Sequence, residues 1–461
     1  MLVHSEKMNP MEQPLNTAPQ AGGVPATLVD PVALRFWLAV LLTGIGTGIA
    51  AVLLMLLLNL VQHTVWPSAD GSILAATSGA PYWKPILIML SAGLLTGIGQ
   101  LILVRLPSGN GIDITEAMLL TCGRLPKLRT LCSAVLSTII VAMGASLGRE
   151  GAPKQTGSVI ANLLSDRTGL SNEQRRLLVA CGAGAGMAAA YGVPLGGAIF
   201  ALEVLRGELA LRFVLPALLA SLAATAVSWL VFPLPFAAHT YVIAPATNTA
   251  SLFIWAGLMG PVAGVLSLLY VRAIAFVVRH PPQGWYRFVF PILGLGLVGC
   301  VGIRFPQVLG NGKDLAQLAF LGKVPLGLLV TLLFLRPIAT IVCLGSGAPG
   351  GLFTPTLTIG AMLGGALGYG WSLLYPGVPP GVFAFIGAAA MLAATTQGPI
   401  SSAILMIELT GYEYSSMVPL LLAVVTATLI ARSFEIRSIY DARLSDEQIQ
   451  TRQRAREKMI V

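Results

Sequence analysis

The chain has 461 residues, of which 55% are hydrophobic and only 10% are charged, whereas charged residues make up about a quarter of a typical soluble domain. This composition excludes an ordinary soluble globular protein. The formal net charge of +9 could indicate nucleic-acid binding, but the basic residues are scattered over loops and a tail, so we interpret them as positive cytoplasmic loops that orient membrane helices, and we expect no nucleic-acid partner.

The first thirty residues contain Pro, Gln, Thr and Gly but few large apolar side chains, and they lack the apolar core of a signal peptide. We expect residues 1–30 to form a disordered cytoplasmic tail. From Leu34 onward, apolar stretches follow one another, and each is long enough for a membrane-spanning helix, which needs about 20 apolar residues. The clearest stretches are residues 34–61, 85–104, 213–231, 252–278 and 326–344.

Other apolar segments are shorter and are interrupted by Gly and Pro. A mixture of full spans with broken or partly inserted helices is typical of transport proteins. Beyond Arg432 the chain becomes polar for about thirty residues, too few for a further globular domain. We therefore predict an all-α integral membrane protein, with a transmembrane domain over residues 31–434 and a short cytoplasmic tail over residues 435–461.

The five cysteines indicate neither a disulfide framework nor a zinc site, because their number is odd and no CxxC pair occurs. We therefore predict no metal site and no cofactor. The cysteines are Cys122, Cys132, Cys181, Cys300 and Cys343.

Three short motifs recur in the same order at an offset of about 200 residues. In the third pair a Glu follows a Pro by nine residues in each half, Glu203 after Pro194 and Glu408 after Pro399. We therefore predict two homologous halves, at about residues 31–235 and 250–434. Residues 109–113 (GNGID) match 310–314 (GNGKD), residues 148–152 (GREGA) match 351–355 (GLFTP), and residues 182–203 match 387–408.

Homologous halves in a membrane often form inverted repeats, with a binding site near the midplane where broken helices meet. The Gly-rich motifs would then lie at helix starts, whose free N–H groups and positive dipole end bind an anion. The same small residues would also let membrane helices pack closely. For a single Gly we favour close packing, and for the three clusters together we favour a site.

Glu150 follows Arg149 inside an apolar segment, where an ionised carboxylate costs about 2.5–3.5 kcal/mol or more unless it is paired or near water. A carboxylate beside an anion path can occupy the anion's own place when ionised and leave it when protonated, so Glu150 is a candidate pH-sensitive gate. The alternative is a structural Arg149–Glu150 pair at a helix cap. The symmetry of Glu203 and Glu408 favours structural hydrogen bonding over proton transfer, and Tyr440 has the position of an interfacial anchor.

These motifs resemble those of the CLC family of chloride channels and anion/proton antiporters, over about residues 34–443. The resemblance rests on GREG at residues 148–151, GxFxP at residues 351–355 and the Gly-rich turn at residues 109–111. Residues 187–204 and 345–355 are similar to the bacterial branch called ClcB. The resemblance implies the CLC fold of two inverted halves, a homodimer with one anion pathway in each subunit, and a multi-pass place in the cell membrane, here the bacterial inner membrane.

Carried over by position, the resemblance implies that Glu150 is the external gating glutamate. It further implies that chloride, the transported ligand, contacts the backbone N–H groups around Leu352 and Phe353 and, from the cytoplasmic side, the hydroxyl of Tyr440. The remaining implied anion-binding residues are Asn110, Gly111, Arg149 and Gly151.

The chain departs from the family pattern at three places. Asn110 and Asp113 replace the serine and proline of the GSGIP turn, and Ala152 replaces the proline of GREGP. Side-chain identity at the first position is associated in the family with anion choice, and some fluoride-exporting relatives vary the same motifs. Val204 stands where chloride/proton antiporters carry an internal glutamate, and channel members also show valine there.

We therefore predict a gated, voltage-dependent chloride channel with Glu150 as its gate. The alternative is an anion/proton antiporter, including fluoride/proton export, since fluoride antiporters also lack the internal glutamate. An intramembrane enzyme with Ser146 as nucleophile would need a base, yet the four histidines fall in tails or loops, so we expect no enzyme. A sodium-coupled organic solute carrier fits the general fold but not the GREG and GxFxP motifs.

Overall fold

The computed structural model describes residues 31–68, 72–106, 113–232, 241–243, 250–411, 416–434 and 437–450. The first half of this part of the chain is built from helices of very unequal length. Its elements are α1 (Pro31–Val65), α2 (Ile73–Ser78), α3 (Trp83–Arg105), α4 (Ile114–Leu120), α5 (Lys127–Ala142), α6 (Gly151–Thr168), α7 (Asn172–Tyr191), α8 (Pro194–Phe200), the π-helical turn η1 (Ala201–Arg206) and α9 (Leu211–Val231).

The second half likewise combines long and short helices. Its elements are α10 (Ala250–Arg279), α11 (Tyr286–Arg304), the 3-10 turn η2 (Pro306–Val308), α12 (Lys313–Phe320), α13 (Leu326–Gly345), α14 (Phe353–Leu374), α15 (Pro380–Thr396), α16 (Pro399–Thr410), α17 (Met417–Phe434) and the 3-10 turn η4 (Ile439–Asp441).

Within the described ranges, eight helices are long and apolar enough to cross a membrane. The five stretches predicted from the sequence are confirmed as helices, because they lie inside α1, α3, α9, α10 and α13. The other three are α11, α14 and α17. Short helices such as α8, α12 and α16 are too brief to cross a bilayer, which needs about 20 residues, so the predicted mixture of spans and broken helices is confirmed.

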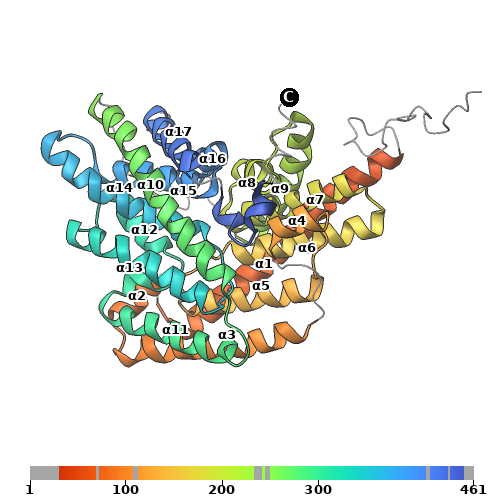
Figure 1. The fold of residues 1–461 in the computed structure, drawn as a ribbon, viewed down its shortest axis with the longest axis horizontal. Helices are drawn as coiled ribbons and strands as arrows, with labels where there is room; N and C mark the ends of the chain where they lie inside the picture. Colours follow the sequence, from red (N-terminus) through yellow and green to blue (C-terminus); the bar gives the residue numbers. More distant parts are fainter. Residues whose placement is uncertain are drawn as a thin grey trace, which may run out of the picture.

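The two halves lie side by side and use matching helix pairs. In Figure 1 α4 to α9 lie to one side of α10 and α12 to α17, whereas α2 lies on the side of α12 and α13. In the first half α6 packs on α7 and α1 on α9, and in the second half α14 packs on α15 and α10 on α17. The packing of α3 against α11 joins the halves at one end of the molecule (Figure 1).

Glycines bring the paired helices into backbone contact. A Cβ added at Gly182 of α7 would lie 2.3 Å from the carbonyl oxygen of Gly157 in α6, and one added at Gly387 of α15 would lie 2.6 Å from the carbonyl oxygen of Gly360 in α14. Small residues allow such close approach between membrane helices. Close packing therefore accounts for the glycines at the start of the third repeated motif.

The chain breaks its helices in the same way in both halves. Between α7 and α8, Gly192 adopts a left-handed conformation (φ 72°) and Pro194 begins the next helix. Between α15 and α16, Gln397 takes the left-handed conformation (φ 57°) and Pro399 begins the next helix. A residue in the left-handed conformation commonly ends a helix. Pro fits the first turn of the next helix because it lacks a backbone N–H, and the N–H groups of a first turn have no carbonyl partner within the helix. The chain thus turns sharply just before Pro194 and Pro399, at matching positions of the two halves.

Candidate functional site

Two helix starts from opposite halves meet at a pair of glycines. Gly148, just before α6, and Gly351, just before α14, exchange backbone hydrogen bonds of 2.7 and 2.8 Å. These two residues open the second repeated motif in each half, about 200 residues apart. The structure therefore brings the GREG and GxFxP motifs into direct contact.

Glu150 is fully buried at this junction and its carboxylate lies at the start of α14. Its Oε1 accepts a hydrogen bond of 2.7 Å from the backbone N–H of Phe353. Its Oε2 accepts hydrogen bonds from the hydroxyls of Tyr191 at 3.0 Å and Thr354 at 3.3 Å. A helix start binds anions through its free N–H groups and its positive dipole end. The carboxylate of Glu150 thus takes a place that suits a free anion.

The space for this carboxylate exists because two neighbours have no side chain. A Cβ added at Gly351 would lie 2.0 Å from Oε1 of Glu150, and one added at Gly148 would lie 2.2 Å from Oε2. Cβ atoms do not approach other atoms so closely in real proteins. Only glycine at these two positions therefore leaves room for the carboxylate of Glu150.

Arg149 lies against a cavity of about 270 Å³, which we call the outer cavity. Lys313 and Asp314, at the start of α12, line the same cavity. The Arg149 guanidinium lies 4.9 Å from the ring centroid of Tyr191 and makes no ion pair within 4.0 Å of Glu150. The alternative of a structural Arg149–Glu150 pair is therefore wrong for the described structure.

A second, smaller cavity of about 110 Å³, which we call the inner cavity, lies against the starts of α6 and α14. Gly151, Leu352 and Tyr440 line it together with Lys154. The Lys154 ammonium donates a hydrogen bond of 3.3 Å to the Tyr440 hydroxyl and lies 4.3 Å from the centroid of its ring. Because Arg149 lines the outer cavity and Gly151 the inner one, the buried Glu150 stands between the two cavities.

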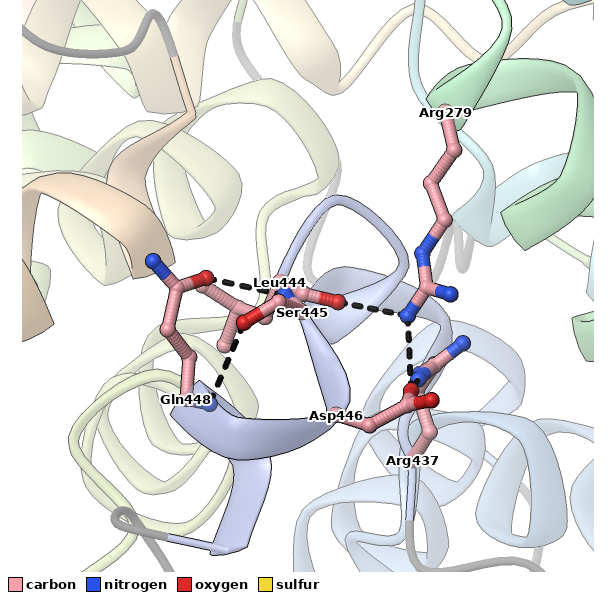
Figure 2. Close-up of polar contacts among 6 residues, drawn as sticks. All are labelled: Arg279, Arg437, Leu444, Ser445, Asp446 and Gln448. Carbon is pink, nitrogen blue, oxygen red and sulfur yellow. Dashed lines mark hydrogen bonds and ion pairs between the residues drawn. The ribbon is translucent and has the colours of Figure 1, made fainter.

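Hydrogen bonds on both sides of Tyr440 in the sequence hold this residue in place. Asp446 accepts hydrogen bonds from Arg279, at the end of α10, at 3.1 Å and from Arg437 (Figure 2). Arg279 also donates to the carbonyl oxygen of Leu444 at 2.7 Å. These hydrogen bonds hold the pKa of the Asp446 carboxyl below its usual range. The segment 437–450 is therefore tied to α10 and positions Tyr440 at the inner cavity.

Glu203 and Glu408 bind the starts of each other's helices. Glu203 accepts hydrogen bonds from the backbone N–H groups of Ile400 at 3.2 Å and Ser401 at 2.6 Å in α16. Glu408 accepts them from Leu195 at 3.0 Å and Gly196 at 2.6 Å in α8. This geometry agrees with the predicted structural role. These two helix starts hold the protein's own carboxylates, so the third repeated motif contributes helix caps in place of an anion site.

The predicted site residues fall into four groups. Glu150 and Phe353 are bonded to each other, and Gly151, Leu352 and Tyr440 line the inner cavity. Arg149 lines the outer cavity instead. Asn110 and Gly111 lie outside the described residues.

Sequence reasoning missed three residues of the site, Lys154, Tyr191 and Thr354. For Lys154 a signal was present, because an ionisable residue inside an apolar membrane segment is a functional candidate by default. Tyr191 and Thr354 carry no such signal. Their hydroxyl oxygens lie 2.6 Å apart and both reach Glu150, because the fold brings the end of α7 to the start of α14. Ser146, the nucleophile of the enzyme alternative, is buried and its hydroxyl contacts that of Thr340 at 3.3 Å.

Comparison with known proteins gives a consistent result. Residues 96–432 match the family described as "Voltage gated chloride channel". A putative chloride channel protein, ClcB-like, from Ralstonia nicotianae is 34% identical over 389 residues, which are 81% of this chain and 88% of the relative. The voltage-gated ClC-type chloride channel ClcB of Escherichia coli is 34% identical over 384 residues, which are 80% of this chain and 89% of the relative.

Solved structures show the same fold. A slow cyanobacterial Cl⁻/H⁺ antiporter superposes with a TM-score of 0.77 at 23% identity, over 91% of this chain and 99% of the other. A CLC-type fluoride/proton antiporter superposes with a TM-score of 0.66 at 21% identity, over 90% of this chain and 99% of the other. The predicted fold class is thereby confirmed.

Proposed function

Because the chain belongs to the CLC family of voltage-gated chloride channels, in its ClcB-like branch, we propose that it is a gated, voltage-dependent chloride channel in which Glu150 is the gate. One observation carries this proposal. The carboxylate of Glu150 accepts the backbone N–H of Phe353 at 2.7 Å, between a cavity lined by Arg149 and one lined by Tyr440. An anion that passes from one cavity to the other must displace it.

The gate works by competition for the same hydrogen-bond donors. An ionised Glu150 neutralises the positive end of α14 and excludes a second negative charge. Protonation removes the charge of the carboxyl group and weakens its bond to Phe353, since hydrogen bonds to charged acceptors are about twice as strong as neutral ones. The side chain then leaves, and chloride takes its place at the amide.

The second candidate function is exchange of an anion for a proton, with either chloride or fluoride as the anion. The hydroxyls of Tyr191 and Thr354 favour it, because they contact each other and Oε2 of Glu150 in buried surroundings. Such a hydroxyl pair can accept and donate protons beside the gate. Two of the structurally similar proteins, the cyanobacterial Cl⁻/H⁺ antiporter and the CLC-type fluoride/proton antiporter, carry out exchange of this class.

A flux measurement on the purified protein in liposomes tests the two candidates. A chloride gradient is imposed, and anion release and internal pH are recorded together. A channel gives anion current that reverses at the chloride equilibrium potential with no proton movement. Proton uptake driven by the anion gradient would instead identify an exchanger. The absence of any anion flux would contradict both candidate functions.

The proposal extends to assembly and location. We expect two copies to form a homodimer with one pathway each, in the bacterial inner membrane. Mass measurement of the detergent-solubilised protein, corrected for bound detergent, should give twice the mass of 48.1 kDa. A monomeric mass, in a detergent from which the protein can be reconstituted into liposomes with full anion flux, would contradict the dimer.

A further inference from the structure

Lys154 places a buried positive charge at the inner cavity. Its backbone N–H donates to the carbonyl oxygen of Glu150 at 3.2 Å, so the residue lies in the first turn of α6. Only 5% of the residue is exposed, and its side chain lines the cavity beside Gly151 and Tyr440. An ammonium group in such surroundings is costly unless a negative charge lies nearby.

The carboxylates nearest to the cavity are already engaged elsewhere. Asp113 also lines the inner cavity, but its Oδ1 accepts the backbone N–H of Thr115 at 2.9 Å and so caps α4. Glu150 is bonded to Phe353 and Tyr191. Within the described part of the chain, no carboxylate oxygen lies within 4.0 Å of the Lys154 ammonium. The Lys154 ammonium therefore has no direct ion-pair partner among the described residues.

Aromatic rings hold the ammonium group at the cavity wall. It lies 4.3 Å from the ring centroid of Tyr440 and 5.3 Å from that of Phe200. Its one hydrogen bond to a side chain in the described structure, to Tyr440, leaves further N–H groups available, because a lysine ammonium has three. Arg443, exposed at the same cavity, adds a second positive charge that draws anions toward it.

We propose that the Lys154 ammonium is a charged ligand of the transported anion in the inner cavity and that it sets the preference for small anions of high charge density. The proposal rests on the anion pathway proposed above. Backbone N–H groups and a tyrosine hydroxyl offer only dipoles, whereas an ammonium adds a full charge whose attraction grows as the anion comes closer. Chloride, with its charge concentrated on one small atom, gains more from this attraction than thiocyanate, in which the charge is spread over three atoms.

Replacement of Lys154 by methionine separates charge from packing. Methionine keeps an unbranched apolar side chain that can fill the space beside Phe200 and Tyr440, and it removes the charge. We expect Lys154→Met to weaken chloride binding, measured by isothermal titration calorimetry in detergent, by about tenfold or more. The chloride-to-thiocyanate flux ratio in liposomes should fall as well. Lys154→Arg should restore much of both, because it retains the charge.

The control is Lys127→Met, which removes a half-exposed lysine that pairs with Asp166. It should leave chloride binding and the anion ratio unchanged. A folded Lys154→Met protein with wild-type chloride affinity and an unchanged anion ratio would overturn the proposal. If Glu150→Gln still removed the pH dependence of flux in that case, the gate would stand and only the role of Lys154 would fail.

A measurement on the unaltered protein keeps the proposal testable even if the variant does not fold. Crystals soaked in bromide should show an anomalous peak in the inner cavity within about 4 Å of the Lys154 ammonium nitrogen, the range of a direct ion contact. Bromide bound at the outer cavity alone would overturn the proposal.

Discussion

The carboxylate of Glu150 and the backbone N–H of Phe353 are joined by a hydrogen bond of 2.7 Å that links the start of α6 to the start of α14. The bond crosses the boundary between the two halves of the chain. The gate and the amide that it covers are therefore supplied by different repeats, and any change that separates the two helix starts should alter gating.

Glu150→Gln should remove most of the pH dependence while anion flow is retained. An amide cannot ionise, so the side chain stays in the state that resembles the protonated gate. The wild-type rate should rise as the pH falls, by at most about tenfold for each pH unit because one proton opens the gate, and the variant should stay nearly flat. Liposome flux between acidic and neutral pH measures this. Glu173→Gln, which alters a half-exposed carboxylate paired with Arg206, is the control; equal pH dependence in Glu150→Gln and wild type would remove Glu150 from the gate.

Gly351→Ala should hold the gate out of its place. The added methyl group would lie 2.0 Å from Oε1 of Glu150, so the carboxylate cannot bind the Phe353 amide as it does now. We expect a higher anion flux at neutral pH and a weaker response to acid.

The matched control for this change is Gly370→Ala in α14, the helix that begins two residues after Gly351. No atom lies within 4 Å of a Cβ at Gly370, and Ala is favoured over Gly in a helix by about 1 kcal/mol. This variant should keep wild-type gating. If Gly351→Ala also kept wild-type flux and pH response, the steric account of the site would be wrong.

Glu203→Gln and Glu408→Gln should destabilise the protein without changing anion choice. Each carboxylate accepts two backbone N–H groups at the start of a helix in the other half, and hydrogen bonds to charged groups contribute about 1.5–3 kcal/mol. Thermal unfolding in detergent should occur at a lower temperature for both variants. A loss of proton-coupled flux in Glu203→Gln at unchanged stability would assign this residue to proton transfer instead.

The segment that carries Tyr440 should detach only in strong acid. Because Arg279 and Arg437 lower the pKa of Asp446, the contact is fully present above the ordinary aspartate pKa of about 3.9 and is lost as the pH falls through the lowered value. Asp446→Asn should release the segment already at neutral pH. Hydrogen–deuterium exchange of residues 437–450 should then be faster than in wild type, and equal exchange would show that the two arginines do not anchor it.

Asn110→Ser should shift relative anion permeability toward chloride. The variant restores the residue type that the CLC turn carries, and an Asn amide and a Ser hydroxyl both donate hydrogen bonds but differ in size and reach. Reversal potentials in mixed chloride, nitrate and fluoride solutions measure the shift. Identical anion ratios before and after the change would show that this turn does not line the pathway.

Several properties could be predicted from the sequence because they depend on local composition. The length of an apolar stretch decides whether it can cross a bilayer, so residues 85–104 and 326–344 were predictable as spans and are helical in α3 and α13. Glu150 was predictable as a functional residue because a carboxylate in an apolar segment is costly wherever its partners lie. The repeated motifs also indicate two related halves, because a sequence repeat does not depend on knowing the contacts.

The partners of these residues were decided only by the tertiary structure. Phe353 meets Glu150, and Lys154 meets Tyr440, across separations of 203 and 286 residues. No local pattern encodes such a contact, since it depends on how α6, α7 and α14 pack and on where the segment after α17 returns. Helix length and the cost of a buried charge are properties of a segment, whereas the counter-charge and the hydrogen-bond donor come from whatever the complete fold brings beside it.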